Sequence, residues 1–555
     1  MKQRVRDLVE QGDRLFAKRQ PLLARWQDIA ENFYPERADF TGPLAVGTDF
    51  AAGLMSGYPV MVRRDLANSF ASMLRPRGQP WFHARTDNER VNNAAGPRAW
   101  LDWASDVLRR MMYDRAAQFS RATKAGDDDF AAFGQCVIKV DVSAERSGLL
   151  YRARHLRDVV WCENAELKID VVHDNWPLEA RELCRLFPGK VHDAVKRCVK
   201  DEPYREIKCR RIILPADQYD SGYAGEGRTR RKFAFRSITM DCENDTILEE
   251  IGIPSIDYVI PRWVTMPGSQ YAYSPAVNIA LPDARMLQQI GLTLLEAGQK
   301  AVDPPKLAVG EIIQGGVNSY AGGVTWVDAD YDERTGEALR DLPIDTRGLN
   351  FGLSVQQKAE MMITEAFYLN KLRLPELKGD MTAYETQKRV EEYIRQALPL
   401  FEPLEIEYNG GLTEKSFEIA LRLNAFGSAV DMPEELRGED VRFQFESPLQ
   451  AASERAKAQA FLQAGQLLQA ALAFDPAVRH DVDIDKAFRD AALGSGIPAE
   501  WLVDEKAAAQ AKQAERRQTA ERAAAQQQLD AASQVADVAG RAGQAAQQLQ
   551  AAGVA

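Results

Sequence analysis

Apolar side chains recur every three or four residues in three segments of the first 130 residues, the spacing of a helix with one buried face. The first segment covers residues 5–33 and is interrupted by Pro21, because proline lacks the amide hydrogen that a helix interior uses. The second ends at Arg75-Pro76, since proline disfavours helix in the residue before it. The third covers residues 100–111. We expect these segments to be packed helices.

From about Gly134 the pattern changes to short runs rich in β-branched and aromatic residues, such as QCVIKVDV, EIKCRRIIL and RKFAFRSITM. Runs of this kind predict β-strands. Two short helical patterns lie near residues 177–200. The middle third is therefore expected to be rich in β-sheet, and the chain as a whole is expected to belong to the α+β class.

Two long helical patterns flank a glycine-rich segment. The first follows Ser274-Pro275 and covers residues 283–302, and it ends before a run of two prolines. Residues 303–352 are rich in glycine and β-forming residues, which predicts a small separate module. The second helical pattern, SVQQKAEMMITEAFYLNKL, follows this module. We therefore expect a helical hairpin with the module inserted at its tip.

The C-terminal part of the chain is predicted to be helical as well. The segment MTAYETQKRVEEYIRQALPLF contains Thr382 and Glu385 at the spacing of a capping box. From Asp504 onward, alanine, glutamine and charged residues replace nearly all large apolar residues. A helix of this composition cannot bury a core alone, so it projects, associates with copies of itself through small side chains, or frays.

Length and charge limit the classes of protein to which the chain could belong. A chain of 555 residues is longer than one hydrophobic core normally organises, so several domains are expected. The formal net charge of −11 disfavours a protein that holds duplex DNA over its general surface. An acidic wall would instead keep a polyanion hydrated and mobile inside a pore.

Targeting signals and cysteines add little to what length and charge indicate about the function. No apolar run reaches the roughly 18 residues of a membrane span, and the first residues are charged throughout, so neither a span nor a secretory signal peptide is expected. The six cysteines form no C-x-x-C pair, which favours reduced thiols in a protein made in the cytoplasm.

The sequence lacks the common motifs of catalytic, nucleotide-binding and metal-binding sites. It contains no G-x-x-x-x-G-K-[ST] phosphate loop, no H-E-x-x-H and no G-x-S-x-G. Two D-x-D-x-D runs begin at Asp328 and Asp481, but calcium loops need glycine at the sixth position, where these runs have Glu333 and Lys486. A turn and a helix N-cap explain them better. We expect no catalytic residue, no cofactor and no metal site, so the chain is not expected to be an enzyme.

One short basic segment is a candidate DNA contact. Lys371, Arg373 and Lys378, with Asp380, lie between two predicted helices, where a basic side chain could meet phosphate. A solvated loop explains the same residues equally well, and both readings stay open.

The order of several motifs resembles the head-to-tail connector (portal) family of short-tailed bacteriophages. The motifs are Arg25-Trp26 before Phe33-Tyr34-Pro35, the segment LANSFASMLRPRGQPWF, the segment DDDFAAFGQCVIKV, the segment YAYSPAVNIALPDARMLQQIGLTLLEAGQKAVDPPKL and the segment MTAYETQKRVEEYIRQALPLFEPLEIE. In the last segment the positions that match the family are Thr382, Ala383, Glu385, Arg389, Leu398 and Pro399. One departure is that the family often has Tyr-Gly-Arg before Ser-Pro, where this chain has Tyr271, Ala272 and Tyr273.

The resemblance implies a portal-type ring subunit and a division of the chain into seven parts. These are a wing over 1–270, helical to about 130 and then β-rich; a first stem helix over 271–302; a small α/β clip over 303–352; a second stem helix over 353–372; a channel loop over 373–382; a long helix and helical crown over 383–502; and a C-terminal helical barrel or tail over 503–555.

The resemblance also implies a function and partners. The chain would form a dodecameric ring at one vertex of the virion capsid, through which double-stranded DNA passes during packaging and ejection. Its partners would be the packaging terminase, tail adaptor proteins and the major capsid or scaffold protein, with no membrane, and it would be made in the host bacterial cytoplasm. The channel loop with Lys371, Arg373, Lys378 and Asp380 would then face DNA.

Two other classes of protein remain open at this point. The chain could be a different virion protein, such as a tail adaptor or an internal scaffold-like component, which uses the same helical tail for assembly. It could also be a DNA-processing enzyme, which would require a metal or nucleotide site. Ring stoichiometry separates the first alternative from a portal, and an activity assay separates the second.

Overall fold

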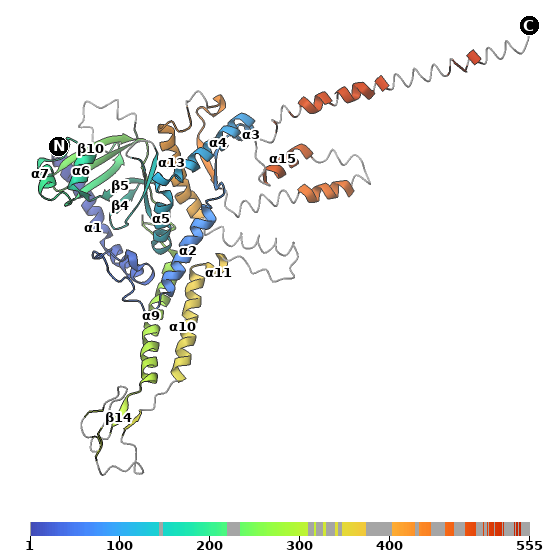
Figure 1. Cartoon of the computed structure of the whole chain (residues 1–555). Helices are drawn as coiled ribbons and strands as arrows, with labels where there is room; N and C mark the ends of the chain where they lie inside the picture. Colours follow the sequence, from blue (N-terminus) through green and yellow to red (C-terminus); the bar gives the residue numbers. More distant parts are fainter. Residues whose placement is uncertain are drawn as a thin grey trace, which may run out of the picture. The chain divides into compact units, whose positions relative to one another are not determined.

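The computed structural model describes residues 2–143, 148–218, 233–308, 313, 316–317, 326–328, 339–341, 347–372, 402–427, 432–445, 461–470, 483–494 and short pieces between 503 and 544. These residues combine helices with antiparallel sheets (Figure 1), and the mixture of helix and sheet agrees with the α+β class that the sequence predicts. The chain divides into two compact units. The first consists of Met1–Phe82, Asp106–Gly427 and Phe445–Ser447, and the second of His83–Ser105, Ser428–Gln444 and Pro448–Ala555.

The first unit begins with helices whose apolar faces meet. They are α1 (Lys2–Phe33), η1 (Pro35–Arg37), α2 (Tyr58–Leu74), η2 (Arg115–Ala117) and α5 (Phe119–Phe133). The expected interruption of the first helix at Pro21 is wrong, because α1 continues through this proline. Trp26, Ile29 and Phe33 on its C-terminal half are buried, and this packing offsets the hydrogen bond that proline removes.

Aromatic rings fill the centre of this unit. Trp26 lies 6.2 Å from Phe133, centroid to centroid, and Phe70 lies 5.9 Å from Phe130 in an edge-to-face arrangement. Trp263, which is far from α5 in the sequence, stacks on Phe130 at 5.4 Å. Such pairs stabilise a core beyond the area that they bury. These five aromatic residues are therefore core positions.

Two antiparallel sheets form the β-rich part of the unit. The larger has the strand order β10-β9-β8-β5-β4, and the smaller has the order β11-β2-β3. Their strands are β2 (Val137–Val142), β3 (Leu149–Arg154), β4 (Val159–Glu163), β5 (Ile169–Asn175), β8 (Cys209–Pro215), β9 (Phe235–Asp241), β10 (Thr246–Ile253) and β11 (Tyr258–Val259). Leu8 and Val9 of α1 pack on Ile212, Ile238 and their neighbours, so α1 covers one face of the larger sheet.

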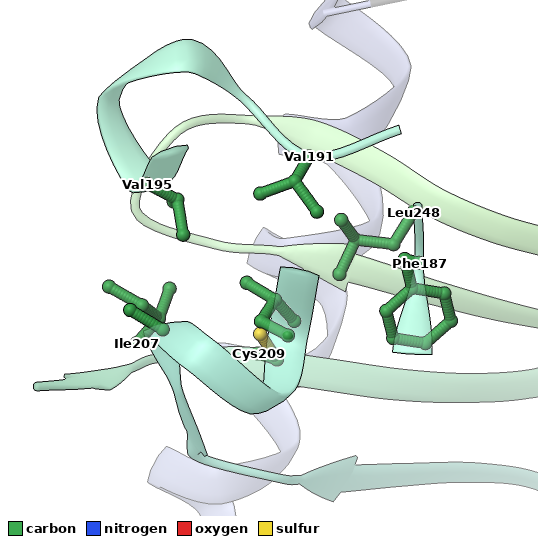
Figure 2. Packing of buried hydrophobic residues seen from close by; sticks show 8 residues of the cluster. Phe187, Val191, Val195, Ile207, Cys209 and Leu248 are labelled. Carbon is green, nitrogen blue, oxygen red and sulfur yellow. The ribbon is translucent and has the colours of Figure 1, made fainter. Parts of the chain in front are cut away.

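A small lobe covers another part of the larger sheet. It contains β6 (Leu178–Glu179), α6 (Ala180–Leu186), α7 (Asp193–Asp201) and β7 (Glu206–Ile207). Figure 2 shows its core, in which Phe187, Val191 and Val195 meet Cys209 and Leu248 of the sheet. The two helices confirm the short helical patterns expected near residues 177–200.

The expected helical hairpin is present, and its helices run side by side (Figure 1). The helices are α9 (Pro275–Val302), α10 (Arg347–Ala366) and α11 (Leu369–Leu372), and the short strands nearby are β12 (Val264–Thr265), β13 (Ala272–Tyr273), β14 (Lys306–Ala308) and β15 (Leu339–Asp341). The pattern that suggested one helix over 353–372 corresponds to α10 and α11, and Tyr368 between them has a left-handed φ of 57°. β14 pairs with β15 within the segment 303–352, of which only part is described.

The first unit is completed by a helical segment after residue 401. It comprises a stretch of π-helix, η3 (Leu404–Gly410), and α13 (Gly411–Arg422). Tyr408 and Leu412 are fully buried, and the Tyr151 hydroxyl of β3 is hydrogen-bonded to Ser416. This segment therefore belongs to the same core as the sheets, although it lies far along the chain. The long helix expected over 381–401 lies outside the described residues.

The second unit has its own small core. Its elements are β1 (Phe82–Thr86), α3 (Glu89–Asn93), the first half of α4 (Ala95–Met112), η4 (Glu434–Leu436), β16 (Val441–Phe445) and α15 (Ile484–Gly494). β1 pairs with β16, and Ala84, Val91, Leu101 and Leu436 pack together. Asp483 accepts a hydrogen bond from the Lys486 amide at 3.2 Å at the start of α15, which confirms the helix N-cap expected in the second aspartate run.

Candidate functional site

The predicted channel-loop residues fall at the edge of the described structure. Lys371 lies on α11, whereas Arg373, Lys378 and Asp380 lie outside the described residues. A DNA-facing role for this loop therefore stays a prediction. What the structure does describe is the hairpin that leads to the loop and the core that holds the hairpin.

The base of α9 is tied to the end of α5. The Ser274 hydroxyl accepts a hydrogen bond from the Val277 amide at 3.4 Å and donates one to the Ala131 carbonyl at 2.8 Å. Pro275 occupies the first helical turn, where its missing amide hydrogen costs nothing. Ser274 is therefore both the N-cap of α9 and a link to the core.

Gly134 permits this link. Its φ is +73°, and a Cβ atom at this position would lie 2.1 Å from the carbonyl carbon of Tyr273 and 2.3 Å from the Ser274 nitrogen. The neighbouring Gln135 side chain accepts a hydrogen bond from the Ala272 amide at 2.9 Å. Only glycine allows the two backbones to approach so closely. The Phe-Gly and Tyr-Ser-Pro motifs, more than a hundred residues apart in sequence, thus meet at the base of the hairpin.

Small residues let the two hairpin helices pack closely. A Cβ atom on Gly352 of α10 would lie 2.7 Å from a methyl carbon of Leu294 on α9. Ala359 and Ile363, which follow on the same face of α10, are buried. Near the upper end of α10, the Tyr58 hydroxyl of α2 is 2.6 Å from the Thr364 hydroxyl. The hairpin is therefore held both along its length and at its base.

The hairpin has no excess of positive charge. α9 contains Asp283, Arg285, Glu296 and Lys300, and α10 contains Arg347, Lys358, Glu360 and Glu365. Acidic and basic residues are thus equal in number on these two helices. Proteins that bind duplex DNA tightly neutralise its phosphates with lysine and arginine, so this pair of helices does not have the charge of a DNA clamp.

A cavity of about 490 Å³ lies between α1, the segment around residues 44–54 and α9. Gln288 of α9 borders it, accepts hydrogen bonds from the Met55 and Ser56 amides at 2.7 and 2.8 Å, and donates one to the Ser56 carbonyl at 2.9 Å. Arg285, which also borders the cavity, forms an ion pair with Asp28 of α1. These contacts hold the segment before α2 against α9.

Three consecutive aspartates of α5 bind three arginines, two from α2 and its C-terminal end and one from η1. Asp127 pairs with Arg75 at the end of α2, Asp128 with Arg63 of α2 at 2.6 Å, and Asp129 with Arg37 of η1 at 2.8 Å. Arg63 also lies 4.0 Å from the Tyr34 ring centroid, and Arg75 lies 4.7 Å from that of Tyr408.

Sequence analysis missed this cluster. The run of three aspartates in DDDFAAF is the feature of the sequence that could have revealed the cluster. These carboxylates directly precede apolar helix residues that are buried.

The Arg75–Asp127 pair is fully buried. Burial lowers the pKa of Arg75, but the Asp127 charge and hydrogen bond, together with the nearby tyrosines Tyr408 and Tyr113, raise the pKa above its usual value. Arg75 also donates to the Asn409 side chain at 3.0 Å, so the pair connects α2, α5 and η3. A buried charge that loses its partner is costly, and this pair therefore fixes the relative positions of these elements.

Two further buried cations anchor α1. Arg19 donates hydrogen bonds to the carbonyl oxygens of Leu156 and Arg157 at 2.6 Å, and burial lowers its pKa to about 10. Arg210 of β8 donates to the Val9 carbonyl at 2.9 Å and pairs with Asp13 at 2.8 Å. His173, beside Arg210, is fully buried, and burial together with the Arg210 charge lowers its pKa to about 3. The imidazole is therefore neutral in the folded protein near neutral pH.

No group of three His, Cys, Asp or Glu side chains in the described part of the chain could hold a metal ion. Among the helices that are described, none is long and apolar enough to cross a membrane.

Comparison with known proteins decides the family. Residues 6–503 match the family model described as bacteriophage head to tail connecting protein. The chain belongs to this family.

Two curated relatives of this connector are portal proteins by name. The "Probable portal protein" of Bordetella phage BPP-1 is 22% identical over 456 residues, which cover 80% of this chain and 79% of the relative. The "Portal protein" of Salmonella phage epsilon15 is 21% identical over 516 residues, which cover 89% and 88%. The similarity therefore extends over most of the connector and is not limited to one motif.

A solved structure with a similar chain is the neck of an empty gene transfer agent (GTA) particle. It matches with 13% identity and a TM-score of 0.36, and the match covers 76% of the connector and 91% of that chain.

Proposed function

We propose that this connector is a portal subunit, twelve copies of which form a ring at one capsid vertex and let DNA pass through during packaging and ejection. Membership of the head-to-tail connecting family supports this function most directly. No bond is made or broken in this role. The contribution of the protein is a pore of suitable width and a wall to which DNA does not adhere.

The hairpin supports a division of labour within the subunit. In this proposal α9 and α10 are the stem and the elements before residue 270 are the wing. The clip is the segment 303–346, six residues shorter than the sequence suggests, because α10 already begins at Arg347. The equal numbers of acidic and basic residues on the stem helices, in a chain of net charge −11, favour sliding of DNA over binding. The clip would meet the terminase and later the tail adaptors, and the wing would meet the capsid or scaffold protein. The crown and barrel would be built from residues 383–555.

Imaging tests the ring directly. The purified full chain is examined by negative-stain electron microscopy with averages along the symmetry axis, and its mass is measured by native mass spectrometry. The proposal expects rings of about twelve copies around an open channel. Monomers, or fibres without a pore, would overturn it and favour a tail adaptor or a scaffold-like component.

The channel loop requires a separate test. Lys371→Glu, Arg373→Glu and Lys378→Glu together reverse the basic charge of the predicted loop, and packaging and retention of DNA are measured in infected cells. Both are expected to fall, because fewer phosphate contacts form. Lys168→Glu, on an exposed lysine that pairs with Glu166, is the matched control. Unchanged packaging in the triple variant would rule out the role of the loop in DNA contact.

A further inference from the structure

The small lobe, residues 176–208, is a connection that the larger sheet does not need. β5 and β8 are adjacent antiparallel strands, and Asn175 at the end of β5 lies opposite Arg210 near the start of β8. A turn of about two to five residues could join such strands, yet the lobe between them has two helices and a core of its own. Connections longer than the fold requires commonly carry function. The outer surface of the lobe is therefore a candidate interaction surface.

The helix α7 turns a charged face away from the core of the lobe. Val195 is buried and is directed into this core (Figure 2), and Cys198 and Val199 pack beside it. These three side chains share one face of α7, because residues three and four apart are neighbours on a helix. Three exposed cations occupy the opposite face of α7: Lys196, Arg197 and Lys200.

Two of these cations have no acidic partner in the described part of the chain. Lys196 pairs with Asp193 at 2.9 Å, whereas among the described residues no carboxylate forms an ion pair with Arg197 or Lys200. Arg197 makes one long hydrogen bond of 3.4 Å, to the Asp193 carbonyl. Residues 176–208 contain eight basic and six acidic residues, in a chain whose net charge is −11. The lobe is thus a basic region of an acidic protein, and it attracts a partner of negative charge.

An aromatic side chain is exposed beyond the end of α7. Tyr204 follows Lys200 by four residues and is 66% exposed. The Arg181 guanidinium of α6 lies 5.1 Å from the centroid of the Tyr204 ring. The Arg181 amide donates a hydrogen bond to the Pro203 carbonyl at 3.1 Å, which holds this part of the chain against α6. Tyrosine and arginine are among the residues that contribute most to the affinity of protein interfaces.

The size of the basic face favours a protein partner over duplex DNA. From Lys196 to Lys200 the helix rises by only about 6 Å. Proteins that hold duplex DNA neutralise several phosphates along it, and a chain of net charge −11 repels a long polyanion. A short acidic protein segment can instead place its carboxylates against Arg197 and Lys200 and an apolar side chain against Tyr204.

We propose that the outer face of α7, together with Tyr204, is the docking site for an acidic segment of the major capsid protein. This inference rests on the proposed position of the ring at a capsid vertex, where the shell surrounds the wing, and it assigns the contact to the small lobe. Arg197 and Lys200 bind carboxylates of the segment, and Tyr204 covers an apolar side chain next to them.

Binding measurements with matched variants test this contact. Arg197→Glu with Lys200→Glu reverses the two cations that lack a partner. Arg14→Glu with Lys168→Glu makes the same change of charge at exposed cations elsewhere and is the control. Each full-length chain is titrated with unassembled major capsid protein at several salt concentrations. The lobe variant is expected to bind at least about tenfold more weakly than the control, and the difference should shrink as the salt concentration rises.

Circular dichroism and electron microscopy check that both variants fold and form rings. Equal affinity of the two variants, or no binding of capsid protein by the unsubstituted chain, would overturn the proposal. The same titrations are made with purified scaffold protein and with a short DNA duplex. A loss of affinity in the lobe variant that is confined to either of these two probes would also overturn it.

Crosslinking in infected cells tests the chemistry of the docked segment. The photoreactive residue p-benzoylphenylalanine takes the place of Tyr204 in one chain and of the exposed Met266 in the control. The crosslink from position 204 is expected to reach a capsid-protein segment that contains aspartate or glutamate, and to disappear when Arg197→Glu and Lys200→Glu are added. A segment without acidic residues, or a crosslink that persists in the combined variant, would contradict the proposal.

The ring assay separates failure of this inference from failure of the proposed function. If the unsubstituted chain forms rings and the lobe variant binds capsid protein as the control does, only the docking site is wrong. If the unsubstituted chain forms no rings, the proposed function itself fails.

Discussion

The hairpin α9–α10 and the centre of the first unit around α5 are built in opposite ways. Around α5, charged groups are buried and each aspartate of the run 127–129 has an arginine partner within the same chain. On the hairpin, apolar groups are exposed and have no such cover. The difference indicates that the ion pairs of the centre are complete in one chain, whereas the hairpin leaves apolar side chains exposed. Substitutions that break the buried ion pairs should therefore lower the stability of the fold more than substitutions on the hairpin.

The largest loss in the free energy of unfolding is expected from a substitution of Asp127. Asp127→Ala leaves the buried Arg75 without its partner and is expected to lower the free energy of unfolding by about 3–5 kcal/mol. Chemical denaturation of the purified chain measures this change. Glu10→Ala is the control, because the exposed Glu10–Arg14 pair on α1 is worth no more than about 0.5 kcal/mol. A loss at Asp127 as small as that at Glu10 would contradict the view that the centre depends on its ion pairs.

The second largest loss in the free energy of unfolding is expected from a substitution at Gly134. Gly134→Ala would place a methyl group against the backbone of Tyr273 in a left-handed conformation, and we expect a loss of about 3 kcal/mol. Gly189→Ala is the matched control, since Gly189 has a φ of +80° but open space around it, and it should lose only about 1 kcal/mol. Thermal unfolding of the two variants gives the difference. Equal losses would mean that the close approach at the base of α9 is unimportant.

His173 should make the folded core sensitive to acid. Its pKa is about 3 in the folded protein because burial and Arg210 disfavour the charged form, whereas an unfolded histidine has a pKa of about 6.5. Below that value the unfolded chain binds a proton that the native protein does not. The stability from this group is therefore complete above about pH 6.5 and is lost as the pH falls toward 3.

The expected loss between pH 7 and pH 5 is about 2 kcal/mol, and His173→Phe should remove that part of the slope. The free energy of unfolding of both chains is measured by denaturant titration at several pH values. An identical pH dependence in the two chains would show that His173 does not contribute.

The smallest change in the free energy of unfolding is expected from substitutions within the hairpin. Alanine favours a helix over glycine by up to about 1 kcal/mol, so Gly348→Ala, which meets open space, should stabilise the chain by about 0.5 kcal/mol. Gly352→Ala should give no gain, because the new methyl group would press on Leu294. Unfolding midpoints of the two variants test this contrast. A gain at both positions would mean that the two helices are not in close contact at Gly352.

Part of this fold can be predicted from the sequence. Ser274, Pro275 and the prolines after Asp303 limit α9 because proline and N-cap residues act locally. The β-rich middle third and the short helices of the small lobe also follow from local patterns of residues. The channel loop with Lys371, Arg373, Lys378 and Asp380 remains a prediction.

Local residue patterns are enough to predict which regions are helical and which are rich in strands, the limits of α9, and the order of motifs that is typical of the family, because all of these depend on residues that are close in the chain. Packing between distant segments is what carries α1 through Pro21, brings Asp127 to Arg75, and places Gly134 against Tyr273. Periodicity shows which residues share a face of a helix. Whether that face is buried depends on what the rest of the chain, or another copy, places against it, and no local pattern contains that information.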